Sequence, residues 1–280
     1  MRALLPGLVL GLGWAFAAPA VHAADLGDSW LRGSMPAHGE SEPTGAWGGF
    51  YIGFQGGYTN ANVDFGTASS SQIAFILRNL AVEQERRISG ATVLPERDVR
   101  GGNYGFLVGY NSQWEDVVLG VELGYTRLNL DAKAAAGNRF WTATSNGYTY
   151  DVGLESSAQV KLTDYLTFRG RAGYDLGNFL PYATLGLAVG RAEVTRSANV
   201  YLCEDTTGST PPACAVGLYG SASERKKDTY AVGIAAGLGL DILLTENLFL
   251  RGEYEYVRFG SFENVNVDFH TVRGAVAAKF

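Results

Sequence analysis

Residues that commonly carry catalytic or metal-binding chemistry are few in this chain of 280 residues. It contains three histidines, and two of them, His22 and His38, lie within the first 46 residues. His270 has Asp268 two positions before it but no serine in an H-x-S arrangement. A nucleophile needs a base within hydrogen-bond reach, and no such pair is visible. We therefore expect no catalytic residue, no metal site and no cofactor, and hence a protein that is not an enzyme.

The two cysteines are the next candidates for chemistry. Cys203 and Cys214 enclose the segment CEDTTGSTPPAC, within a polar stretch of roughly 195–228 that we interpret as a long loop. A metal site there is disfavoured because no histidine is nearby. In a chain that is exported to an oxidising compartment, two cysteines in one loop predict a disulfide. The charged segment SERKKD, 223–228, is interpreted as the solvated rim of the same loop, with binding of anionic glycans or host polymers as the alternative.

The first residues indicate that the chain is exported. Arg2 precedes an apolar run from Ala3 to Ala18, and small residues follow up to Ala23. This is the pattern of a signal peptide, 1–23, cleaved after Ala23. A membrane anchor is the alternative, but the run is short and is interrupted by prolines. Residues 24–46 are polar and lack periodicity, so we predict a flexible lead-in before a single domain that covers 47–280.

Composition limits the class of that domain. The chain has 37 glycines but only 8 prolines, which disfavours helix bundles and proline-rich disorder. Its formal net charge is −6, and no basic stripe with interleaved aromatics occurs. Binding of nucleic acid is therefore not expected.

From Trp47 onward the chain alternates between large apolar residues and small or polar ones. Residues 48–60, GGFYIGFQGGYTN, place Phe50, Ile52 and Phe54 on one face of a strand and Tyr51 and Gln55 on the other. A soluble β-sandwich, the alternative, would spread charges over a whole solvent face. A narrow closed barrel leaves little interior space, so we predict that the small, mixed face is inside and that the apolar face meets lipid.

Isolated charges of both signs occupy the predicted inward face. In a thin lumen, opposite charges are expected to pair and so to form a network. The predicted members of this lumen charge network are Glu122, Arg169, Arg171, Arg251, Glu253, Glu255 and Arg273.

The number of strands depends on residues 148–175. The alternation continues through 163–165 without an apparent slip, with only Asp164 on the unexpected face. We therefore interpret 148–175 as one long strand, which gives an even count, as is usual for bacterial single-chain barrels. The predicted fold is all-β, an eight-stranded antiparallel transmembrane up-and-down barrel with long outer loops.

The first of these loops contains SQIAFILRNLAVEQERR, residues 71–87. Ile73, Ile76, Leu77 and Leu80 follow helical spacing, and Gly90 is the predicted stop. The spacing predicts an amphipathic helix outside the barrel. Two interpretations remain open: the helix caps the barrel mouth or lies on neighbouring loops, or its apolar face binds a partner or lipid headgroups.

Several segments resemble the small eight-stranded outer-membrane β-barrel proteins, namely the opacity-protein and OmpA-like surface antigens of Gram-negative bacteria. These segments are GGFYIGFQGGY, VVLGVELGY, FRGRAGYDLGNFLPYATLGLAVG and the terminal aromatic residue. The resemblance implies location in the outer membrane, a periplasmic position for the lead-in, and contact with outer-membrane lipid and lipopolysaccharide. It also implies that Phe280 is the C-terminal signal that the barrel-assembly machinery recognises.

The family is largely structural or adhesive and has no shared catalytic residues to carry over. The resemblance thus implies a role in envelope integrity, adhesion or host interaction, with host or envelope macromolecules bound through the outer loops. The alternative is a narrow porin-like channel for small solutes. An outer-membrane lipid-modifying enzyme is a third and weaker alternative.

Overall fold

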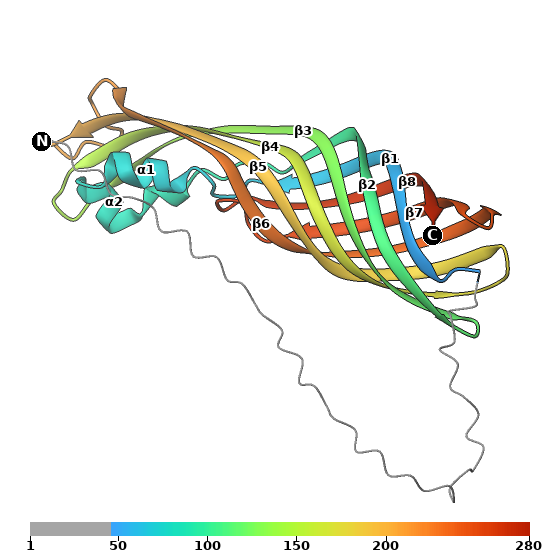
Figure 1. The fold of residues 1–280 in the computed structure, drawn as a ribbon. Coiled ribbons are helices and arrows are strands. Elements are labelled where there is room, and N and C mark those ends of the chain that lie inside the picture. Colours follow the sequence, from blue (N-terminus) through green and yellow to red (C-terminus); the bar gives the residue numbers. More distant parts are fainter. Residues whose placement is uncertain (1–45) are drawn as a thin grey trace, which may run out of the picture. The chain divides into compact units, whose positions relative to one another are not determined.

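The computed structural model describes residues 46–280; the predicted signal peptide, 1–23, and the predicted lead-in up to residue 45 lie outside the described residues. Each strand pairs antiparallel with its neighbours in sequence, and β8 pairs with β1, so the sheet closes (Figure 1). The predicted eight-stranded antiparallel barrel is confirmed. The strands are β1 (Gly49–Asp64), β2 (Arg97–Trp114), β3 (Val117–Ala143), β4 (Thr149–Tyr174), β5 (Phe179–Asp205), β6 (Gly217–Thr245), β7 (Leu248–Phe259) and β8 (Asn266–Lys279).

The outward face of the barrel is apolar, as the alternation predicts. On β1, Phe50, Ile52 and Phe54 expose 63%, 52% and 63% of their surface, whereas Tyr51 and Gln55 on the other face are buried. Such a continuous apolar exterior is stable when lipid covers it. Closure also pairs the backbone of every strand with a neighbour, which leaves no open sheet edge at this level.

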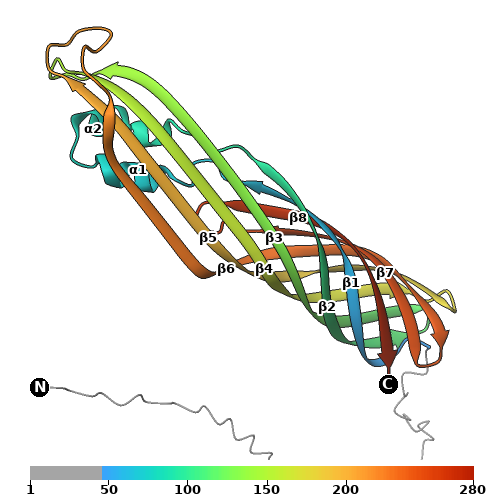
Figure 2. The ribbon, with the colours of Figure 1, turned by 90° about the horizontal axis from the view of Figure 1, so that it is seen from above.

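The two ends of the barrel differ. At one end, residues 115–116, 175–178 and 246–247 form short turns; at the other, longer loops connect the strands, the longest being 65–96. We call these the short-turn end and the loop end. Toward the loop end β3, β4, β5 and β6 continue beyond the other four strands, as Figure 2 shows. We call this four-stranded sheet the extension; it consists of 129–143, 149–163, 191–205 and 217–230.

The long strand expected over 148–175 is present as β4. The expectation that its even-numbered residues lie on one face along the whole strand was wrong. In the barrel, Leu166 and Phe168 face outward, whereas in the extension Val160 and Leu162 are buried. The pairing of β4 with β5 shifts between Leu162 and Asp164, because β4 has one additional residue there, a β-bulge. The bulge turns the even-numbered residues from the outside of the barrel to the inside of the extension.

The predicted helix over 71–87 is also divided. It forms two helices, α1 (Ser70–Leu77) and α2 (Ala81–Arg86), followed by the 3-10 helix η1 (Ile88–Gly90). Leu80 precedes α2 with an extended backbone, φ −95° and ψ 139°, which separates the two helices. Within 46–280, no helix is long and apolar enough to cross a membrane.

The apolar face predicted for this helix packs against the extension (Figure 1). Ile73 and Leu77 are fully buried, and Ile76 and Leu80 are partly buried beside them. Their partners are inward residues of β4 and β5, namely Tyr150, Val152, Leu154, Ala198 and Val200. The sequence left the position of this helical segment open. In the structure the helices lie on the extension.

The loop expected over 195–228 is much shorter than predicted. β5 continues to Asp205 and β6 begins at Gly217, so the loop is only 206–216. SERKKD lies within β6 and not on a loop rim, which corrects the earlier interpretation. Its Glu224 pairs with Arg196 of β5, at 2.6 Å between Arg196 Nη2 and Glu224 Oε2.

Candidate functional site

The seven residues of the predicted lumen charge network lie together inside the barrel. Glu122 lies on β3, Arg169 and Arg171 on β4, Arg251, Glu253 and Glu255 on β7, and Arg273 on β8. All seven side chains are buried, with at most 4% of each residue exposed. Strand alternation directs each of them inward, and the glycines and alanines beside them leave the space that they fill.

Arg169 connects opposite walls of the barrel. Its Nη1 lies 2.5 Å from Glu253 Oε1 and 2.7 Å from Glu255 Oε2, and its Nη2 donates to Glu122. Arg273 donates to the same two carboxylates of β7, at 2.9 Å from Glu255 Oε2. Strands β3, β4, β7 and β8 are therefore joined by charge-assisted hydrogen bonds, which are stronger than neutral ones.

The other two arginines converge on Asp241 of β6, which we did not include in the predicted network. Arg251 Nε lies 2.9 Å from Asp241 Oδ1, and Arg171 Nη2 also donates to Asp241. The guanidinium of Arg171 lies 3.8 Å from the ring centroid of Tyr182, a cation–π contact. With Asp241 included, the cluster contains four arginines and four carboxylates, so its formal charges balance.

Three tyrosines complete the cluster and were also missed. The hydroxyl of Tyr51 donates to Glu122 at 2.8 Å, that of Tyr165 to Glu255 at 2.8 Å, and that of Tyr182 to Glu253 at 2.6 Å. The alternation places Tyr51, Tyr182 and Asp241 on inward positions, so the signal was present. Tyr165 has the same odd parity as Arg169 and Arg171, so the alternation placed it inward as well; the bulge at 163–164 reverses the expected face only for the residues that precede it.

Apolar layers lie on both sides of the ionic cluster. The layer toward the short-turn end consists of Trp47, Leu107, Val118, Leu180, Phe249, Ala275 and Ala277, which pack around Tyr51. The layer toward the loop end is larger and includes Val257, Phe259, Phe262 and Phe269. A cavity in the second layer, lined by Val63, Val99 and Leu130 among others, measures about 10 Å³. That is about the space of a single water molecule.

The disulfide predicted between Cys203 and Cys214 is present, with a Cα–Cα distance of 5.9 Å. Asp205, which follows Cys203 closely, organises the loop that the disulfide closes. Its carboxylate accepts hydrogen bonds from Thr207 N at 2.8 Å, Thr207 Oγ1 at 2.6 Å and Ala213 N at 2.7 Å. These hydrogen bonds hold the pKa of Asp205 well below its usual range.

The remaining residues singled out from the sequence lie on the outer surface. Phe280 exposes 78% of its surface, and its backbone N–H donates to Phe50 O at 2.8 Å. His270 faces outward on β8, with Nδ1 2.6 Å from the Tyr254 hydroxyl. Within the described part of the chain, no three histidine, cysteine, aspartate or glutamate side chains are grouped so as to hold a metal ion.

Comparison with known proteins gives consistent matches. The family model described as "Outer membrane protein beta-barrel domain" matches residues 15–280. The chain is 26% identical over 277 residues to the 31 kDa outer-membrane immunogenic protein of Brucella melitensis biotype 1, which covers 92% of this chain and 96% of that protein. It is 25% identical over 266 residues to the 22 kDa outer membrane protein of Rhizobium leguminosarum bv. viciae, covering 93% and 87%.

Among solved structures, Neisserial surface protein A matches with a TM-score of 0.39 and 17% identity over 82% of this chain and 97% of that one. The family model covers nearly the whole chain, and the relatives are named as outer-membrane proteins. The chain therefore belongs to the outer membrane protein β-barrel domain family and is located in the outer membrane.

Proposed function

We propose that this protein is a structural and surface-display protein whose barrel lumen is closed to solutes and whose extension presents a rigid surface outside the cell. The observation that carries the proposal is the balanced ionic cluster, which fills the barrel between two apolar layers. Short turns face the periplasm and long loops face outward in barrels of this kind. The extension would then stand on the external side.

The way in which the charges are satisfied supports a closed lumen. Burying a charge is costly unless a partner of opposite sign and hydrogen bonds compensate for it. Here each carboxylate of the cluster accepts hydrogen bonds from at least two donors, for example Arg251 and Tyr51 at Glu122. A conducting path would have to replace these contacts with water. We propose no catalytic role for this protein, and in this respect the proposal differs from the third alternative, a lipid-modifying enzyme.

One observation favours the alternative of a narrow porin-like channel. Several nitrogen atoms in the cluster have no hydrogen-bond partner within the described residues, namely Nε of Arg169, Arg171 and Arg273 and Nη1 of Arg171. Water that satisfied these atoms would be the start of a hydrated path.

Conductance in planar bilayers distinguishes the two functions. If the lumen is closed, the purified wild-type protein gives no stable conductance steps. Steady, ion-selective steps from the wild type would overturn the proposal in favour of the channel. An Arg139→Gln variant, which changes an exposed residue of the extension, is the matched control and is expected to behave as the wild type does.

We propose outer-leaflet lipopolysaccharide as a partner of the barrel rim. Arg127, Arg191 and Arg258 lie on the outward face of β3, β5 and β7, just beyond the apolar belt at the loop end. The short-turn end carries acidic residues instead, at Glu115, Asp116, Asp175 and Glu246. Guanidinium groups at this level suit phosphate headgroups. Replacing the three arginines with glutamine should lower the amount of lipopolysaccharide that copurifies, and an unchanged amount would contradict this.

We also propose that Phe280 contributes to recognition by the barrel-assembly machinery. It directly follows β8, and its exposed aromatic ring lies at the short-turn end beside β1. Phe280→Ala should lower the fraction of the protein that is inserted in cells while leaving refolding into detergent unchanged. Equal insertion of variant and wild type in cells would count against this role.

A further inference from the structure

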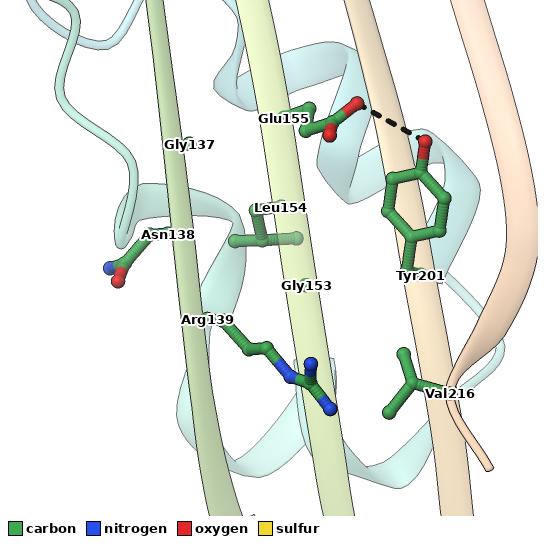
Figure 3. A pocket seen from close by; sticks show the side chains of 8 residues that line it. All are labelled: Gly137, Asn138, Arg139, Gly153, Leu154, Glu155, Tyr201 and Val216. Atoms are coloured by element: carbon green, nitrogen blue, oxygen red, sulfur yellow. Dashed lines mark hydrogen bonds between the residues drawn. The ribbon is translucent and has the colours of Figure 1, made fainter.

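The outward face of the extension carries a groove that none of the roles above uses (Figure 3). It has a volume of about 570 Å³ and lies across β3, β4 and β5, on the opposite side of the sheet from the helices. It continues into a second hollow of about 460 Å³, which shares Gly137 and Glu155 with the first. The two hollows therefore form one open-ended groove along the strands.

Small residues form the floor of this groove. Gly137 and Gly153 lie under the first hollow, and Ala135, Ser157 and Ser197 lie under the second. A sheet face exposed to water usually carries longer polar side chains, which would fill such a hollow. Tyr201 lies opposite Gly153 across the β4–β5 pair, and the glycine leaves room for its ring beside β4. Figure 3 shows the ring of Tyr201 on the solvent side of the sheet.

Polar groups line the walls in pairs. Glu155 Oε2 lies 3.2 Å from the Tyr201 hydroxyl and 3.4 Å from Asn199 Nδ2. On the other side, Arg139 donates to Asp151 from Nε at 3.1 Å and from Nη2 at 2.9 Å. The arginine side chain is 67% exposed, so it retains donors that face solvent. The groove thus offers donors and acceptors side by side, and its three charged groups, Glu155, Asp151 and Arg139, sum to a formal charge of only −1.

The loop closed by the disulfide forms one end of the groove. Val216 lines the first hollow and follows Cys214 by two residues. The disulfide joins this loop to the end of β5 at Cys203, two residues after the Asn199–Tyr201 segment that forms one wall. The end wall is therefore covalently fixed, which favours a groove that exists before any ligand binds.

From these features we infer that the groove binds an uncharged oligosaccharide in an extended conformation. Paired donors and acceptors match the adjacent hydroxyl groups of a sugar ring, and the face of Tyr201 offers an apolar surface to its C–H groups. A formal charge of −1 disfavours a polyanion and is too small to select a polycation. The open end and the two adjoining hollows suit several linked sugar units. The inference rests on the proposed display function, because the groove must face the outside of the cell.

The experiment uses the oxidised protein, residues 24–280, inserted in lipid nanodiscs. Calorimetric titration with maltohexaose, cellohexaose and mannohexaose measures binding, and a sulfated heparin hexasaccharide serves as the anionic comparison. We expect at least one neutral hexasaccharide to bind more tightly than the sulfated one. Tyr201→Ala should weaken binding at least tenfold. Gly137→Leu should do the same by filling the groove, and it is sterically mild because a Cβ there meets its nearest atom, Leu154 O, at 3.5 Å.

Tyr219→Ala is the matched control, since Tyr219 is an exposed tyrosine of the extension that does not line either hollow, and it should bind as the wild type does. The inference is overturned if no neutral hexasaccharide binds, if the sulfated one binds as tightly, or if Tyr201→Ala and Gly137→Leu both retain wild-type affinity. Conductance of the same nanodisc preparation after transfer to planar bilayers keeps the two proposals apart. A non-conducting protein that binds no sugar refutes the groove alone, whereas a conducting one refutes the closed lumen.

Discussion

Replacing Glu253 with alanine tests whether the charges inside the barrel stabilise one another. The Glu253 carboxylate accepts hydrogen bonds from Arg169, Arg273 and Tyr182, with the Tyr182 hydroxyl at 2.6 Å. The variant leaves four arginines facing three carboxylates in a lumen whose side chains are almost fully buried. Removing one partner of a buried ion pair typically costs about 3–5 kcal/mol. We expect Glu253→Ala to lower the free energy of unfolding by about that amount.

The assay is equilibrium unfolding in urea of the protein refolded into phospholipid vesicles, with the linear extrapolation used for each variant. Glu193→Ala is the control, because Glu193 forms a partly exposed surface ion pair with Arg225 at 2.6 Å. Such surface pairs contribute about 0–1 kcal/mol. A double variant, Glu253→Met with Arg273→Met, restores the charge balance and should regain part of the lost stability.

A loss for Glu253→Ala no larger than that for Glu193→Ala would refute the reasoning. It would mean that water solvates the charged side chains of the lumen, and a channel would then describe the lumen better. A double variant as unstable as the sum of its two single variants would also contradict a pairing of Glu253 with Arg273.

Three further predictions concern the barrel as a whole and its outer loop. Because the closed sheet resists unfolding, the folded protein should migrate differently from a boiled sample on a detergent gel, and identical migration would contradict the barrel. Replacing Cys203 and Cys214 with serine should leave barrel assembly intact and loosen only the loop, at a cost of at most about 3 kcal/mol. The lowered pKa of Asp205 means that its stabilising contacts are present above the ordinary aspartate pKa and are lost only as the pH falls through the lower folded value. The amide proton shifts of Thr207 and Ala213, which donate to this carboxylate, should therefore stay constant from pH 7 to about pH 4, and a midpoint near the ordinary value of about 3.9 would show that these bonds are absent.

The composition of the lumen was largely predictable, and its contacts were not. Alternation with period two decides which face of a strand a residue occupies, and this suffices to place Glu122 or Arg273 inside. Depth in the barrel depends on the stagger between strands, which appears in the structure as registers such as Glu122 opposite Arg169. Without that stagger, Asp241 was one inward acid among several and could not be assigned to the arginines it contacts.

The outer loops were predicted less well because most of one of them, 195–228, is sheet. Residues 195–205 and 217–228 contain many polar side chains, which suggested a loop, yet they alternate in burial within β5 and β6. Serine, threonine and asparagine are acceptable on a strand whose outer face meets water. The helical segment was located correctly, since Ile73 and Leu77 are buried, but the extended residue Leu80 gave no signal of the break.

The error at residues 163–165 has a physical cause that the neighbouring strands reveal. Outside the barrel wall the medium is lipid, whereas outside the extension it is water, so the apolar face must change from outer to inner between them. On β4 the apolar residues keep even numbers, and a bulge changes the face. On β3 the even-numbered residues face inward along both the barrel and the extension. The apolar residues therefore change parity: they are odd-numbered up to Tyr125 and even-numbered from Leu128.

The bulge on β4 and the change in apolar parity on β3 lie at the same level of the sheet. Arg127 of β3 is paired in register with Asp164, Asp164 with Arg191 of β5, and Arg191 with Tyr230 of β6. Asp164 and Arg191 also form an ion pair on the outer surface of this row. Polar groups on the outward face are costly in hydrocarbon but favourable at its boundary with water. The residue that looked misplaced in the sequence, Asp164, therefore lies where the four long strands leave the lipid, and a change in apolar parity on adjacent strands is the signal that identifies this level.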